Sequence, residues 1–166
     1  MVSLKDIQNA RQLLHSVAVR TPLVLCKLPE DRQIFIKPEN LQPVGSFKLR
    51  GAYNKISSLT AEERKRGVVA HSSGNHAQGV AFAALALGVK ATIVMPRNAP
   101  QVKLDATRNL GAEIVMVGPA SAERIQKAEE LEKEHGLVPV PPYNDEKIIA
   151  GQGTIGLEIM DEMPFP

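Results

Sequence analysis

Short apolar runs alternate with longer segments of helical character between residues 68 and 140. This alternation predicts β-α-β units, and with them a parallel sheet joined by right-handed crossovers. The fold class is therefore α/β. The expected strands are Val68–His71, Ala91–Met95, Glu113–Val117 and Leu137–Val140, and the expected helices are Ala77–Leu87, Gln101–Leu110 and Ala122–His135.

The expected helix Ala77–Leu87 is apolar on almost every side. A surface helix has one polar face, so a helix without one is buried on both sides. We expect this helix to lie between the sheet and a second layer. The architecture predicted is a small parallel-sheet domain with helices on both faces, together with the N-terminal part of a second α/β domain.

The segments on either side of the repeat are less regular. Ser3 and Asp6 resemble a helix N-cap, and apolar residues recur at helical spacing as far as Val17. The other expected elements are strands Leu23–Cys26 and Gln33–Lys37, a helix from about Lys48 to Ile56, a short helix opened by the capping box Thr60 and Glu63, and a last helix opened by Gly151.

Composition narrows the classes of partner. A net charge of +2 and an aromatic content of 4% favour no nucleic-acid surface. No apolar stretch approaches the about 20 residues of a membrane helix, so no membrane partner is expected. The single cysteine, Cys26, indicates a reducing, cytoplasmic setting. The histidines lack metal-ligand spacing, and we expect no metal site.

Lys48 stands at the centre of the stretch Gly45-Ser-Phe-Lys-Leu-Arg-Gly-Ala52. A lysine amine is a nucleophile only when neutral, and burial lowers its pKa. Gly45 and Gly51 carry no Cβ and permit close approach of backbone or ligand, while Phe47 offers an aromatic face. Most lysines are solvated surface charges, however, and these residues alone favour that alternative.

A second run, Ser72-Ser-Gly-Asn-His-Ala-Gln-Gly79, follows the first expected strand of the sheet. Ligands of parallel sheets bind beyond the carboxyl ends of the strands, and a helix N-terminus there favours an anion. The alternative is a structural loop in which Ser73 or Asn75 caps the helix. The glycines match neither the dinucleotide nor the P-loop signature, so a nucleotide is not favoured.

Three motifs carry a resemblance when they are taken together and in this order: residues 43–52, residues 72–79 and residues 150–154. They resemble the threonine/serine dehydratase and serine racemase branch of the fold-type II pyridoxal-phosphate enzymes, which is related to tryptophan synthase β. The resemblance spans essentially the whole chain and implies pyridoxal 5'-phosphate as the cofactor.

The resemblance also implies roles for individual residues. Lys48 would bond covalently to the cofactor, Phe47 would lie near its pyridine ring, and Asn75 would hydrogen-bond its phenolic oxygen. Once freed from the cofactor, Lys48 would take the Cα proton of the substrate. The residues implied around the substrate carboxylate are Ser72, Ser73, Asn75 and His76.

The implied activity is that of an ammonia-lyase, which turns a β-hydroxy amino acid, threonine or serine, into a 2-oxo acid and ammonia. Ser73 is a second catalytic candidate, because it matches the position where racemases hold an acid/base for the opposite face. A serine racemase is therefore one alternative, and a non-catalytic truncated remnant that needs a partner chain is another. Ser73 could equally be a carboxylate donor or a helix cap.

The resemblance predicts a division into residues 1–57, the N-terminal part of a large domain carrying Lys48, residues 58–144, the small domain, and residues 145–166, the start of the C-terminal part of the large domain. The glycine-rich loop that holds the cofactor phosphate in the family is expected beyond residue 166. We therefore expect the chain alone to be impaired or inactive. It should form a homo-oligomer or associate with the missing C-terminal half.

Overall fold

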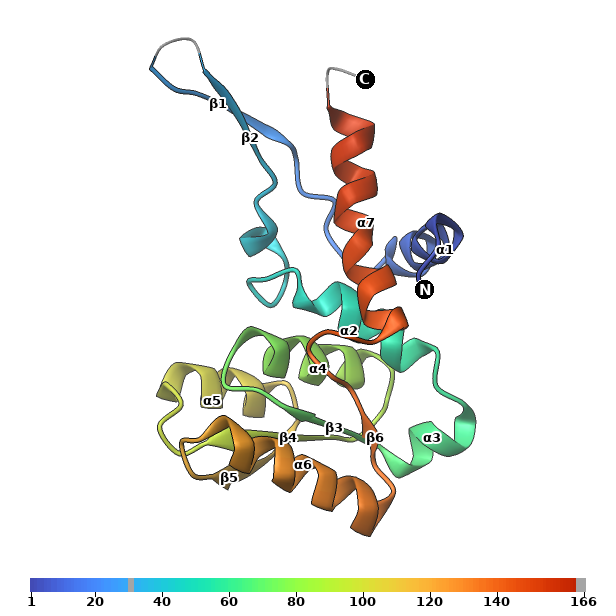
Figure 1. Cartoon of the computed structure of the whole chain (residues 1–166), viewed down its shortest axis with the longest axis vertical. Coiled ribbons are helices and arrows are strands. Elements are labelled where there is room, and N and C mark those ends of the chain that lie inside the picture. Colours follow the sequence, from blue (N-terminus) through green and yellow to red (C-terminus); the bar gives the residue numbers. More distant parts are fainter. Residues whose placement is uncertain (30–31, 164–166) are drawn as a thin grey trace.

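A computed structural model describes residues 1–29 and 32–163. Its centre is a four-stranded sheet with the order β5-β4-β3-β6, in which every pair is parallel (Figure 1). The alternation of strands and helices thus predicted the sheet correctly. Its strands are β3 (Val68–His71), β4 (Ala91–Pro96), β5 (Glu113–Val117) and β6 (Val138–Pro139).

Strand β6 is shorter than the expected Leu137–Val140. Pro139 lies within it and Pro141 and Pro142 follow. A proline has no backbone N–H, so it cannot donate to a neighbouring strand. The ladder between β3 and β6 is accordingly limited to the pairs Val68 with Val138 and Val69 with Pro139.

Helices cover both faces of the sheet, as expected. Helices α4 (Asn75–Ala86) and α5 (Gln101–Asn109) lie on one face, and α6 (Ser121–His135) lies on the other (Figure 1). Each face has its own apolar core. The first contains residues of α4 together with Val68, Ile93 and Met95, and the second joins Val69 and Val94 to α6.

Helix α4 lies between the sheet and helix α2 (Lys48–Ser57), and it is buried along most of its length (Figure 1). This confirms the prediction made from its apolar surface. The two helices cross closely at Gly79. A Cβ added there would stand 2.9 Å from the carbonyl carbon of Lys48, so only glycine permits this approach of the backbones.

The second layer is built from α2 with α1 (Leu4–Leu14) and α7 (Glu146–Glu162). Ser3 and Asp6 form a capping box at the expected N-cap, and α1 ends at Leu14. Strands β1 (Val24–Lys27) and β2 (Gln33–Ile36) form an antiparallel hairpin that projects from this layer (Figure 1). A 3-10 helix, η1 (Glu39–Leu41), leads towards α2.

The start of α7 corrects the sequence analysis. We expected Gly151 to open this helix, but it begins at Glu146, where the carboxylate of Asp145 accepts from two backbone N–H groups of the first turn. Gly151 lies inside the helix because α7 crosses α2 there. A Cβ at this position would come within 2.5 Å of the Arg50 carbonyl oxygen.

The remaining helix is α3 (Ala61–Arg66), which the capping box of Thr60 and Glu63 opens as expected.

None of the helices in the described part of the chain is long and apolar enough to cross a membrane. Residues 1–29 and 32–163 also hold no group of three His, Cys, Asp or Glu side chains placed to bind a metal ion. The division of the chain at residues 57 and 144 stays a prediction.

Candidate active site

Lys48 is the first residue of α2 and is half-buried. Its Nζ donates a hydrogen bond to the carbonyl oxygen of Pro142, 2.8 Å away, and lies 5.2 Å from the centroid of the Phe47 ring. Burial lowers the pKa of this amine below its ordinary value, because desolvation disfavours the ammonium. The structure therefore departs from the alternative of a freely solvated lysine.

The run Ser72–Asn75 forms the turn between β3 and α4, at the carboxyl edge of the sheet. The backbone N–H of Ser72 donates to Val94 of the next strand, and the Ser72 hydroxyl accepts from the N–H of Gly74. Gly74 is the N-cap of α4, and no side chain caps this helix. The alternative in which Ser73 or Asn75 caps α4 is therefore wrong.

The N-terminus of α4 lacks a side-chain cap, as do those of α2, α5 and α6. The side chains of Ser3, Thr60 and Asp145 cap α1, α3 and α7, respectively. The first N–H groups of a helix carry partial positive charge and need acceptors. At α4 they remain available for an anion, in a turn that also carries two serine hydroxyls.

Asn75 has a partner that the sequence analysis missed. Its Oδ1 accepts a hydrogen bond from Nζ of Lys103, on α5, over 3.1 Å. Since the amide oxygen is engaged, the NH₂ group of Asn75 is the part left to meet a ligand acceptor. Lys103 also places a cation beside the open end of α4. The sequence held one signal for this contact: Lys103 is the third residue of α5, the helix that follows the neighbouring strand β4.

His76 is 4% exposed, and its Nε2 lies 2.9 Å from the carbonyl oxygen of Val140. Burial lowers the pKa of this ring to about 4, and the nearby charges of Lys48 and His71 act in the same direction. The ring is thus neutral at pH 7, and its Nε2 carries the proton because a carbonyl can only accept. Because the ring N–H is engaged, only the backbone N–H of His76 is available for the expected contact with the substrate carboxylate.

A network of ion pairs around Arg50 holds the start of α2 in place. The Arg50 side chain is fully buried, and its guanidinium contacts the carboxylates of Glu39 and Glu158, the Thr154 hydroxyl and the Val19 carbonyl. Although burial alone would lower the pKa of Arg50, hydrogen bonds to both carboxylates raise it. Arg50 therefore stays charged and joins α2 to η1 and α7.

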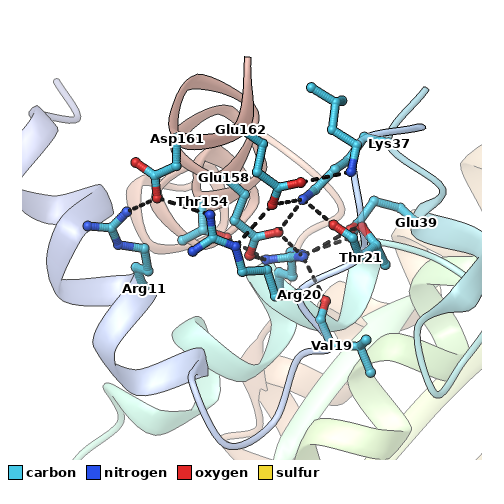
Figure 2. Close-up of polar contacts among 12 residues, drawn as sticks. Arg11, Val19, Arg20, Thr21, Lys37, Glu39, Thr154, Glu158, Asp161 and Glu162 are labelled. Atoms are coloured by element: carbon cyan, nitrogen blue, oxygen red, sulfur yellow. Dashed lines mark hydrogen bonds and ion pairs between the residues drawn. The ribbon is translucent and has the colours of Figure 1, made fainter. Parts of the chain in front are cut away.

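Figure 2 shows how this network continues from α7 to the hairpin. Lys37, the residue after β2, contacts Glu158 at 2.9 Å and Glu162 at 3.3 Å. Arg20 reaches Glu162 and Asp161. A cavity of about 580 Å³ lies beside these residues, but Lys48 does not line it. Nothing in the local sequence indicated these pairs, which join residues far apart in the chain.

The site therefore combines a half-buried amine with an open helix N-terminus at the junction of two layers. Such an arrangement suits a small anionic ligand that reacts with an amine. The chain belongs to the pyridoxal-phosphate-dependent enzyme family, because the pattern of the family described as "Pyridoxal-phosphate dependent enzyme" matches residues 16–166.

Three relatives define the branch. The chain is 52% identical to an L-threonine ammonia-lyase of Thermotoga maritima, over 99% of this chain and 42% of that protein. Threonine deaminase isoform 2 of Solanum lycopersicum superposes with a TM-score of 0.90 and 45% identity, covering 97% of this chain and 45% of that one. Serine racemase of Dictyostelium discoideum gives a TM-score of 0.89 and 37% identity, covering 99% and 54%.

These relatives confirm the resemblance to the threonine/serine dehydratase and serine racemase branch and the tryptophan synthase β-like fold. The chain spans about half the length of the curated relatives that it matches. Each relative extends well beyond the region that it shares with this chain.

The family implies pyridoxal phosphate, and the described residues fit its reactive end. The amine of Lys48 is partly desolvated beside the half-exposed ring of Phe47. Ser46 Oγ, before the start of α2, and Gln78 Nε2, in the first turn of α4, are buried and have no hydrogen-bond partner. Because buried polar groups are ordinarily satisfied, unpaired atoms on both sides of this junction are consistent with a ligand there.

Proposed function

We propose that this chain is part of a pyridoxal-phosphate-dependent threonine/serine dehydratase, which forms a 2-oxo acid and ammonia from a β-hydroxy amino acid. The observation that carries the proposal is the half-buried Lys48 amine, whose pKa is lowered by burial beside the open N-terminus of α4. The names of the relatives, which include an L-threonine ammonia-lyase, support the same activity.

In this proposal Lys48 holds the cofactor covalently, Phe47 lies near its pyridine ring, and Asn75 hydrogen-bonds its phenolic oxygen. The bound cofactor supplies an electron sink for charge that develops at the substrate Cα. The hydroxyls of Ser72 and Ser73 and the free N–H groups of α4, with that of His76 among them, bind the substrate carboxylate. Once the substrate amine has displaced it from the cofactor, Lys48 would take the Cα proton as a general base, and its lowered pKa increases the fraction of neutral amine that can do so.

Reductive trapping tests the cofactor assignment. The chain is incubated with pyridoxal phosphate and reduced with borohydride, and the labelled lysines are mapped by peptide mass spectrometry. We expect the label to concentrate on Lys48, since the ammonium there is destabilised by burial. The Lys48→Arg variant should lose this label and keep the background on exposed lysines such as Lys65. A label spread evenly over surface lysines would refute the assignment.

We propose further that residues beyond position 166 hold the cofactor phosphate, and that a C-terminal half covers the projecting hairpin. Val24, Leu25, Ile34 and Ile36 of this hairpin are 42–46% exposed, and a two-stranded hairpin is only marginally stable by itself. Losing two or three hydrogen bonds to the phosphate costs on the order of 5 kcal/mol, or several thousand-fold in affinity. The chain alone should therefore be weakly active.

Complementation separates the forms of association. Addition of the C-terminal half of a full-length relative as a separate chain should raise lyase activity and shift the chain to a heterodimer in sedimentation. A homo-oligomer that gains no activity from that half would contradict this part of the proposal.

A cytoplasmic location is also proposed, and the single cysteine, Cys26, supports it.

Serine racemisation is a second candidate activity, favoured by the exposure of Ser73 and by its absence from the cap of α4. In the complemented enzyme, Ser73→Ala should abolish formation of D-serine from L-serine and leave formation of pyruvate largely intact. Chiral chromatography and a pyruvate assay on the same sample measure both products. Equal losses of both products would instead identify Ser73 as a carboxylate-binding residue. Parallel assays with threonine and serine give the substrate preference.

A further inference from the structure

The segment Val140–Pro142, here called the strap, leads from β6 towards α7 past the start of α2. Pro141 and Pro142 have no backbone N–H, and the N–H of Val140 donates to the Val69 carbonyl of β3 over 2.9 Å. Beyond Val140, the strap can therefore be held through its backbone only by its carbonyl groups.

Two side chains supply donors for these carbonyls. His76 Nε2 donates to the Val140 oxygen at 2.9 Å, and Lys48 Nζ donates to the Pro142 oxygen at 2.8 Å. The two acceptors are two residues apart, whereas the donors come from different layers of the molecule. The strap thus connects the first turn of α4 to the amine at the start of α2.

We propose that His76 is a positioning residue for Lys48, because it holds the strap where the Pro142 carbonyl receives the Lys48 amine. This inference rests on the proposed function in one respect, which is that Lys48 is the reactive group. A carbonyl accepts from an ammonium and from a neutral amine alike, so the Pro142 oxygen fixes the amine in both protonation states.

The burial of His76 and of Val140, which accepts its hydrogen bond, supports this role. Val140 is 1% exposed, and His76 is 4% exposed, so water does not replace the hydrogen bond between them. The N–H of Val140 bonds to β3, and His76 holds the carbonyl of the same residue, so both backbone groups at the start of the strap are fixed. Removal of the imidazole would leave the Val140 carbonyl buried without its side-chain donor and free the strap beside Lys48.

Competitive acetylation of the chain tests the proposal without cofactor. An acetyl ester of N-hydroxysuccinimide modifies neutral amines, and mass spectrometry gives a rate for each lysine, with the exposed Lys65 as internal reference. In His76→Leu, the relative rate at Lys48 should rise about tenfold, the factor expected when a hydrogen bond to a charged group is lost. His76→Gln, which keeps an N–H donor, should restore most of the protection.

Two further variants distinguish positioning from general loosening. Pro141→Gly relaxes the strap without touching His76 and should also raise the Lys48 rate. Val80→Ala removes fully buried volume one turn further along α4 and should leave that rate unchanged. The proposal is overturned if Val80→Ala raises the rate as much as His76→Leu, or if both His76→Leu and Pro141→Gly match the wild type. Failure of cofactor trapping at Lys48 would refute the proposed function but leave these rates interpretable.

Discussion

Replacement of Arg50 by alanine is expected to lower the free energy of unfolding by about 3–5 kcal/mol, the usual cost of removing one partner from a buried ion pair. The side chains of Glu39 and Glu158 are only 11% and 8% exposed, and both would lose the guanidinium that neutralises them. Arg50 also joins α2 to η1 and α7, so the loss affects the whole second layer. Urea denaturation followed by circular dichroism measures the change.

Two controls make this result specific. Arg108→Ala removes an arginine that is 53% exposed and pairs with Asp105 at 3.5 Å, so it should change stability by no more than about 1 kcal/mol. Arg50→Lys keeps the charge but loses the planar fork that serves two carboxylates, and it should fall between the wild type and alanine. It also gives a measurable value should the alanine variant be unfolded. Equal stabilities of Arg50→Ala and Arg108→Ala would show that the network contributes nothing net.

The parallel sheet could be predicted because its signals are local. Strand Glu113–Val117 was predicted to the residue, since a short apolar run between two helices has few other interpretations. The capping box of Thr60 and Glu63 could also be recognised from the sequence, because its hydrogen bonds lie within one helical turn. The start of α7 was predicted wrongly because glycines usually punctuate helices, whereas Gly151 serves a crossing with another helix.

The candidate site was only partly accessible to the same reasoning. The turn at Ser72–Asn75 follows from the rule that parallel sheets bind ligands at their carboxyl edge. A role for Lys48 was implied only by the family resemblance that the three motifs carry together. The contacts of Lys48 with the Pro142 carbonyl and of Arg50 with Glu158 join residues 94 and 108 positions apart. Such pairs depend on how the layers pack, and no local pattern encodes them.

Helix α7 carries two glycines with opposite expected responses to alanine. Gly151→Ala should destabilise the chain by about 1–3 kcal/mol, the usual cost of overpacking. The new Cβ would meet the Arg50 carbonyl oxygen at 2.5 Å and the Gly51 Cα at 2.8 Å, and both are backbone atoms that cannot rotate away. Gly156 is exposed and has nothing within 4 Å of an added Cβ, so Gly156→Ala should stabilise the helix by about 0.5–1 kcal/mol.

Thermal denaturation of the two variants measures this contrast, because about 1 kcal/mol shifts the midpoint by roughly 2–4 °C in a chain of this size. Gly151→Ala should also reduce cofactor trapping at Lys48, since the displaced backbone of Arg50 lies two residues from that amine. Gly156→Ala should leave trapping unchanged. Shifts of the same sign in both variants would contradict the close crossing of α2 and α7. Without that crossing, the buried pairs of Arg50 with Glu158 could not form, and the start of α2 would lose its support.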